Sequence, residues 1–73
     1  MHRTPRLTAT NLRTELEAQG RMQYWLARQI GITQGNMSKI VLGKRTVGPE
    51  RAGHIARLLD VRVETIFEVQ KPS

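Results

Sequence analysis

Residues 23–42 read QYWLARQIGITQGNMSKIVL, and this stretch predicts two short helices joined by a sharp turn. Apolar residues in its first half recur with the 3.6-residue period of one helix face: Leu26, Ala27 and Ile30. Gly31 follows them, and glycine tolerates the left-handed backbone that turns a chain sharply after a helix. Thr33 is then well placed to cap a second helix. We therefore expect helices over residues 23–30 and 34–42.

The apolar residues of this stretch fit a seam between its two helices. They are Leu26, Ile30, Ile32, Met37 and Ile40, with Val41 at the margin. The small residue Ala27 lies where the helices would cross at close range, and this arrangement is a helix-turn-helix pattern. The alternative is a generic helical hairpin inside any small bundle. Such hairpins seldom combine these spacings with a window free of acidic residues, so the helix-turn-helix is favoured.

The remainder of the chain also has helical patterns, and the simplest fold is all-α with five short helices. Residues 1–7 contain Pro5 and no apolar period, which predicts a flexible basic arm. A first helix is expected after Thr8 or Thr10, with Gly20 at its C-terminal end. The sequence contains no period-two run of β-branched residues, so no strand is expected.

Two more helices are expected after the central stretch. Pro49 suits the first turn of a fourth helix, which should run to about Leu59. Its apolar face is Ala52, Ile55, Ala56, Leu58 and Leu59. A short fifth helix should contain Val63, Ile66 and Phe67, and residues 70–73 should fray. The domain is thus expected to span residues 8–69.

The charge of the chain is unevenly distributed along it. The 73 residues include 12 Lys and Arg against 6 Asp and Glu, a formal charge of +6. Residues 1–45 carry the whole excess, residues 46–73 are balanced, and no acidic residue lies between Glu17 and Glu50. A folded anion-binding surface is therefore expected in the first two thirds, with nucleic acid as the first candidate partner and acidic lipid as the second.

Several classes of function are disfavoured. Domains below ~80 residues bury little apolar surface, which leaves little room for a substrate cleft. The chain has no cysteine, and its two histidines, His2 and His54, lack metal-site spacing. No catalytic arrangement and no span of ~20 apolar residues is visible. We expect no enzyme activity, no cofactor, no metal and no membrane partner, and a soluble protein inside the cell.

Beyond the motif, residues 8–67 resemble the Cro and phage-repressor family of helix-turn-helix domains. The residues that carry the resemblance are Gln23, Leu26-Ala27, Gly31-Ile32-Thr33-Gln34, Met37-Ser38-Lys39-Ile40, Gly43-Lys44-Arg45, Ile55-Ala56, Leu59 and Val61. The resemblance implies a five-helix domain that binds double-stranded DNA, with its second motif helix in the major groove. It also implies a small repressor of a bacterium, phage or prophage that acts by occupying an operator. We accordingly expect the protein in the cytoplasm of a bacterial or phage-infected cell, in association with the nucleoid.

The resemblance assigns base reading to four residues of the second motif helix. Carried over, Gln34 would read a base, Gly35 would allow close approach, and Ser38 and Lys39 would face the groove on the next turn. The chemistry agrees, because a glutamine amide can bond adenine at N6 and N7 and a lysine can reach guanine O6 and N7. In the family, a glutamine at the place of Gln23 braces the reading glutamine and touches phosphate.

Phosphate contacts are expected around that helix. Amides at the start of the helix over 23–30 would bind one phosphate, and Asn36, Lys44 and Arg45 would hold neighbouring ones. The alternative for Lys44 and Arg45 is an ordinary solvated loop. Arg3 and Arg6 of the arm either follow a groove or remain free.

A single recognition helix usually binds DNA as part of a dimer, and a homodimer on DNA is expected. The first candidate surface is the apolar part of residues 58–69, namely Leu58, Val61, Val63, Phe67 and Val69. Tyr24 and Trp25 form the second, since the family usually has exposed polar residues there; the alternative is that Trp25 covers the edge of the first helix. With Val41 and Leu42, they also support a rival function, an antitoxin or other module that binds a protein partner.

Overall fold

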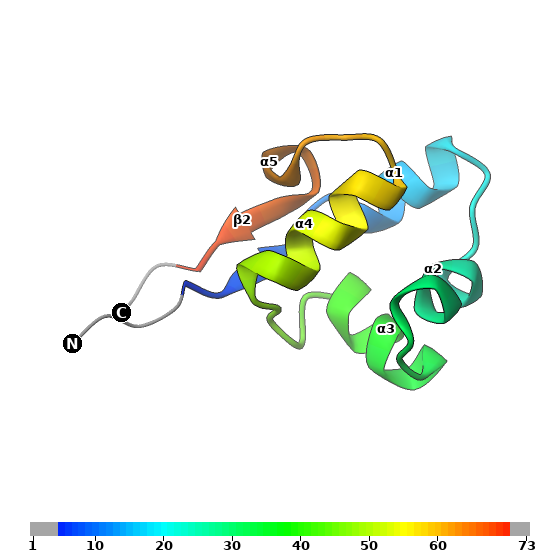
Figure 1. Ribbon diagram of the computed structural model, residues 1–73, viewed down its shortest axis with the longest axis horizontal. Helices are drawn as coiled ribbons and strands as arrows, with labels where there is room; N and C mark the ends of the chain where they lie inside the picture. The colour runs from blue at the N-terminus through cyan, green and yellow to red at the C-terminus, as the bar shows by residue number, and fades with distance from the viewer. Residues whose placement is uncertain (1–4, 71–73) are drawn as a thin grey trace.

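Five helices and one small sheet build the domain (Figure 1). The computed structural model describes residues 5–70. In chain order the elements are β1 (Leu7–Ala9), α1 (Leu12–Ala18), α2 (Gln23–Ile30), α3 (Gln34–Val41), α4 (Pro49–Leu58), α5 (Val63–Ile66) and β2 (Phe67–Val69). The five predicted helices are confirmed, with ends that differ by a few residues. The expectation of a strictly all-α fold is wrong, because residues 7–9 and 67–69 pair in a sheet.

The sheet joins the two ends of the domain. β1 pairs antiparallel with β2, which places Leu7 opposite Val69 and Ala9 opposite Phe67. On its other side, Leu7 exchanges two backbone hydrogen bonds with Val47, at 2.8 and 2.9 Å. Leu7 is buried in the core, so placing it in a flexible arm was wrong. Strands of three residues are too short to show an alternating pattern, and their pairing depends on tertiary contacts.

The same pairing determines where α1 begins. The backbone amides of Thr10 and Asn11 both donate to the carbonyl of Ile66, at 3.0 and 3.3 Å. These hydrogen bonds hold Thr10 and Asn11, which follow β1, against the end of α5, and α1 begins at Leu12. The expectation that Thr8 or Thr10 caps this helix was wrong, because Asn11 occupies the N-cap position and makes no side-chain cap. At the other end of the chain, the amide of Gln70 donates to the carbonyl of Arg6, so the backbone of Gln70 is paired.

One apolar core lies between all the helices. α4 crosses the middle of the domain, with α2 and α3 side by side beyond it (Figure 1). The fully buried residues of large volume come from every helix: Leu12, Leu16, Leu26, Met37, Ile40, Ile55, Leu59 and Ile66. Trp25, Ile30 and Ile32 pack against this core while half-exposed. The core holds α2 and α3 against the rest of the chain.

Asp60 connects α4 to α5 in a conformation that glycine usually takes. Its φ angle is 56°, the only positive value among the non-glycine residues described in 5–70. The amide of Asp60 donates to the carbonyl of Arg57 and that of Val61 donates to Ala56, which closes the end of α4. A side chain with a Cβ is strained in this conformation, although aspartate tolerates it better than most residues.

Glycine at position 60 should relieve that strain. We expect Asp60→Gly to be more stable than Asp60→Ala by about 1 kcal/mol, measured by urea unfolding, since both variants remove the same charge. The same pair at His54, inside α4, is the control, and there Ala should exceed Gly by about 1 kcal/mol. If Ala is also the more stable at position 60, the left-handed conformation does not limit stability.

Candidate nucleic-acid interface

The turn between α2 and α3 is built on one buried carbonyl. Gly31 has a φ of 85°, and its amide and that of Ile32 both donate to the carbonyl of Ala27, at 2.9 and 3.1 Å. Ala27 is 2% exposed, so its small side chain lets the two helices approach closely. The hydroxyl of Thr33 then accepts a hydrogen bond from the amide of Asn36, at 3.1 Å, and caps α3. These contacts fix the direction in which α3 leaves the turn.

The four residues predicted to read bases occupy the outer side of α3. Met37, Ile40 and Val41 are buried on its inner side. Gln34, Gly35 and Lys39 are exposed, and Ser38 is half-buried. Because residues four apart share a helix face, Gly35 and Lys39 lie in the middle of the exposed side, with Gln34 and Ser38 beside them. This face carries amide, hydroxyl and ammonium groups and no carboxylate.

Gln23 and Gln34 line the same shallow hollow, beside Arg13, Arg21 and Tyr24. Gln23 is the first residue of α2 and Gln34 the first of α3. The residue before α2, Met22, makes no side-chain cap. The start of α2 therefore presents backbone amides without a side-chain cap next to the base-reading edge of α3, which is a suitable place for an anion.

The loop after α3 is tied to the end of that helix. The amides of Lys44 and Arg45 both donate to the carbonyl of Lys39, at 2.9 and 3.2 Å. The Arg45 Nη1 atom also donates to the Asn36 Oδ1 atom, at 2.9 Å. Lys44 and Arg45 are exposed, and Asn36 is half-buried. The predicted phosphate-binding residues of α3 and the loop are therefore brought together.

Arg6 is held against this loop by side-chain hydrogen bonds. Its Nε atom donates to the Thr46 hydroxyl at 3.1 Å, and its Nη2 atom donates to the Thr46 carbonyl at 3.0 Å. The expectation that Arg6 belongs to a flexible arm was wrong, because pairing of Leu7 with Val47 brings it beside Thr46. Arg3, the other predicted contact of the arm, lies outside the described residues.

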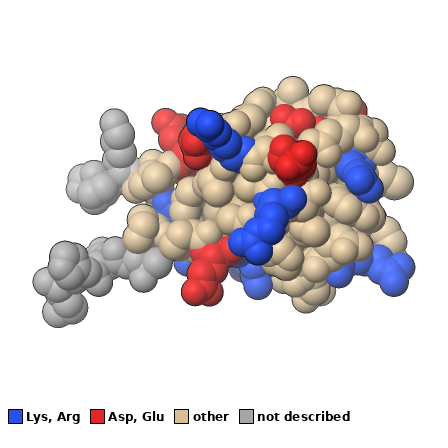
Figure 2. Space-filling view, turned by 45° about the horizontal axis from the view of Figure 1, so that its top comes forward, with Lys and Arg blue, Asp and Glu red and all other residues tan. Residues whose placement is uncertain are grey.

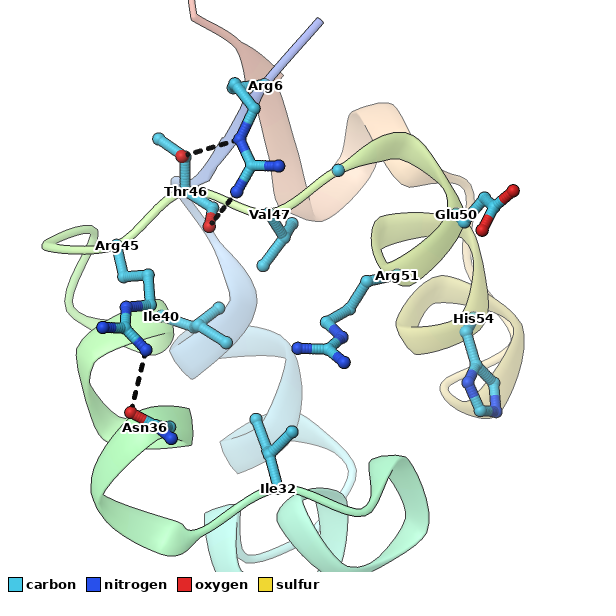
Figure 3. Close-up of a pocket in the computed structure, with 11 residues that line it drawn as sticks. Arg6, Ile32, Asn36, Ile40, Arg45, Thr46, Val47, Glu50, Arg51 and His54 are labelled. Atoms are coloured by element: carbon cyan, nitrogen blue, oxygen red, sulfur yellow. Dashed lines mark hydrogen bonds between the residues drawn. The ribbon is translucent and has the colours of Figure 1, made fainter. Parts of the chain in front are cut away.

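Sequence reasoning missed two residues that border this surface, Arg51 and His54 of α4. They line an open cleft together with Arg6, Asn36 and Arg45 (Figure 3). Their position depends on how α4 packs beside α3, which no local pattern reveals. The stretch without acidic residues, which ends at Glu50, was a partial signal for Arg51, because Arg51 is the next residue in the sequence.

One face of the domain carries charges of both signs. Figure 2 shows this face, on which Asp and Glu side chains lie among Lys and Arg. Two ion pairs occur among residues 5–70, Arg13–Glu17 at 3.3 Å and Arg62–Glu64 at 4.0 Å. Neither includes a residue of α3 or of the loop over 44–48. The basic groups of α3 itself and of this loop thus have no carboxylate partner in the described part of the chain.

The two aromatic residues of α2 lie beneath arginines. The Arg21 guanidinium lies 4.3 Å from the centre of the Trp25 ring, and that of Arg28 lies 5.8 Å from the Tyr24 ring. Trp25 is half-buried against the core, while Tyr24 is 50% exposed. A large part of the Trp25 surface is therefore already covered within one chain. Tyr24 keeps more of its ring available to a partner.

The C-terminal apolar surface is smaller than expected. Phe67 is 3% exposed and belongs to the core, so naming it as an interface residue was wrong. Leu58, Val61 and Val63 are half-buried, and Val69 is 56% exposed. Val41, which was expected to extend an exposed edge, is buried; Leu42 beside it is 55% exposed. Sequence alone missed the burial of Phe67 because the pairing of β2 with β1 determines it.

Within residues 5–70, no group of three or more His, Cys, Asp or Glu side chains is placed to hold a metal ion. None of the helices described there has the length and apolar character needed to cross a membrane.

The contact between Arg21 and Trp25 can be tested by mutation. Arg21→Ala should shift Trp25 emission to longer wavelength and lower the free energy of unfolding by about 0.5–1 kcal/mol, because a cation–π contact at an exposed site contributes that much. Arg28→Ala is the matched control and should leave the emission unchanged. Identical spectra for Arg21→Ala and the parent protein would contradict the contact.

Comparisons with known proteins agree with this geometry. A crystal structure from Bacteroides fragilis, of a protein provisionally described as DNA-binding, superposes with a TM-score of 0.77 at 21% identity. The alignment covers 85% of this chain and 98% of that one, and at this identity it shows the fold alone. No curated protein sequence matches significantly. The family model for Cro/C1-type helix-turn-helix DNA-binding domains matches residues 11–72. The chain therefore belongs to the Cro/C1-type family of helix-turn-helix DNA-binding domains.

Proposed function

We propose that this domain is a sequence-specific regulator of transcription that represses by occupying an operator. The observation that carries the proposal is the outer face of α3, which presents Gln34, Gly35 and Lys39 to solvent and has no carboxylate of its own. Glu17, which lines the hollow beside Gln34, is paired with Arg13. The helix is held rigidly by buried residues on its other side and by the Thr33 cap. Rigid support of this kind is what base reading requires, because a displaced side chain loses its hydrogen bonds.

The side chains on this face suit the edges of bases in the major groove. Gln34 would donate to adenine N7 through its amide nitrogen and accept from N6 through its oxygen. Lys39 would donate to guanine O6 and N7, and Gly35 leaves room for the DNA at the centre of the face. Gln23 lines the same hollow as Gln34, which supports its role in bracing the reading glutamine. Each good base contact contributes ~1–3 kcal/mol of discrimination.

Phosphate contacts would position the domain on the duplex. Lys44 and Arg45 are exposed on a loop that is bonded to the end of α3, and Arg45 is oriented by Asn36. Arg6 reaches the same loop from β1. These groups would attract every duplex alike, whereas the face of α3 would choose among sequences.

Binding as a homodimer is part of the proposal. A single module of this size buries about 600–1,000 Å² on DNA, so two copies on paired half-sites are needed for high affinity. Val69 with the half-buried Leu58, Val61 and Val63 is the first candidate contact, and Tyr24 with Trp25 is the second. The rival function of an antitoxin or other protein-binding module has weaker support, because Val41 is buried and Trp25 is largely covered.

Substitution at position 34 should separate base reading from general attraction. Gln34→Ala should relax the sequence preference in a selection from random duplexes, costing ~1–3 kcal/mol on the preferred site and little on others. Gln29→Ala removes the same kind of amide from exposed α2 surface and should leave the preference unchanged. Selection that enriches no motif with the parent protein would contradict the function and favour the protein-partner reading.

Arg45→Gln should show the opposite behaviour. It removes a phosphate contact, so affinity should fall by a similar factor on every duplex and the selected motif should stay the same. Arg57→Gln, an equal charge change in the last turn of α4, is the control. A change of motif without a general loss of affinity would reverse the assigned roles of α3 and the loop.

Two chains should bind each selected operator. Analytical ultracentrifugation of the saturated complex should give a mass of two chains per duplex, with half-sites about 34 Å apart on a pseudopalindromic motif. Saturation by a single chain on an asymmetric motif would contradict the dimer.

A further inference from the structure

A basic cleft lies on the Asn36 side of α3, and its lining includes none of the four residues proposed to read bases. It is an open hollow of about 660 Å³ between α3, the loop over 44–48 and the start of α4. Arginines reach it from three separate segments: Arg6 from beside β1, Arg45 from the loop and Arg51 from α4 (Figure 3). Ile32, Ile40 and Val47 form its apolar lining. The cleft therefore gathers three cationic groups over an apolar floor.

The cleft keeps a net positive charge, because three arginines line it against a single glutamate. Glu50 is its one acidic lining residue. In Figure 3 the Glu50 carboxylate points away from Arg51, whose guanidinium extends into the hollow. The two ion pairs found among residues 5–70 lie elsewhere. Like charges held together without a counterion repel one another, so an anion in the cleft would be bound favourably.

Two of the three arginines are already oriented. Arg6 uses Nε and Nη2 on Thr46, which leaves both hydrogens of Nη1 available. Arg45 uses Nη1 on Asn36, which leaves other donors available. Because these side chains are held before any ligand arrives, binding would cost little of their conformational freedom. Arg51 completes the set from the opposite wall.

The place of the cleft beside α3 indicates which anion it takes. Gln23 and Gln34 line a hollow on one edge of α3, and the cleft borders the other edge through Asn36 and Ile40. A helix in the major groove has a phosphate backbone on each side, since the groove is bounded by both strands. Residues on the two edges of α3 would thus face different DNA strands.

We infer that this cleft is a phosphate-binding site for the DNA strand on the Asn36 side of α3, and that Arg51 is its principal new contact. The inference rests on the proposed docking of α3 in the major groove. A backbone phosphate would occupy the cleft that Arg6, Arg45 and Arg51 line. The site would add affinity and fix the orientation of α3 without contributing sequence preference.

The test is Arg51→Gln in the full chain, with affinity for a selected duplex measured across salt. The slope of log affinity against log salt should become shallower by ~0.9, the value for one lost phosphate contact. Affinity at fixed low salt should fall about tenfold, because hydrogen bonds to charged groups are stronger than neutral ones. Selected motifs should not change. Arg57→Gln removes the same charge from the same helix outside the cleft and should leave the slope nearly unchanged; thermal unfolding checks that both variants fold.

Failure of this site can be told from failure of the proposed function. If Gln34→Ala relaxes the motif while Arg51→Gln and Arg57→Gln give equal slopes, the cleft does not hold a DNA phosphate and the function stands. If the parent protein selects no motif, the function fails. In that case the slope of log affinity against log salt is measured on random duplex. If Arg51→Gln leaves this slope unchanged, the proposed phosphate site in the cleft is overturned as well.

Titration with inorganic phosphate, followed by NMR of the arginine side chains, distinguishes the other source of the anion. We expect no saturation at millimolar phosphate, because a free ion lacks the neighbouring contacts of a duplex. Saturable binding that Arg51→Gln abolishes, with no effect of this variant on the DNA slope, would make the cleft a site for free anions and overturn the proposal.

Discussion

The close crossing of α2 and α3 is the constraint on which the rest of the domain depends. It requires a small side chain at Ala27, a left-handed residue at Gly31, and a carbonyl that accepts two amides of the turn. A larger side chain at position 27 would separate the helices, and a β-branched residue at position 31 would strain the turn. Because Met37 and Ile40 pack into the core from this crossing, they determine which face of α3 remains outside.

The second constraint is the sheet, which brings the start of the chain to the loop after α3. Pairing of Leu7 with both Val69 and Val47 closes the domain around its core. The same pairing places Arg6 on Thr46, beside Arg45. A basic residue that is remote in sequence thereby becomes part of the surface around α3. Packing and the distribution of charge are linked here, since one buried leucine orders the arginine that precedes it.

The parts of the fold that local patterns determine could be predicted from the sequence. The bounds of α2, the Thr33 cap and the inner face of α3 follow from spacing and turn chemistry, and the structure agrees with them. The strands could not be predicted, because three residues carry no period and their partners lie at the far end of the chain. The burial of Phe67 and the approach of Arg51 to the loop also depend on tertiary packing. Hydrophobicity alone therefore did not distinguish a buried residue such as Phe67 from an exposed one such as Val69.

In the proposed complex, α3 and the adjoining basic surface meet DNA while the α5 and β2 side does not. Titration of the ¹⁵N-labelled domain with a selected duplex, followed by backbone amide shifts, tests it most directly. The largest changes should fall within residues 33–39 and 44–51, with smaller ones at the start of α2. If the largest changes instead fall on residues 61–70 while α3 is unaffected, the account of how this domain binds DNA is contradicted.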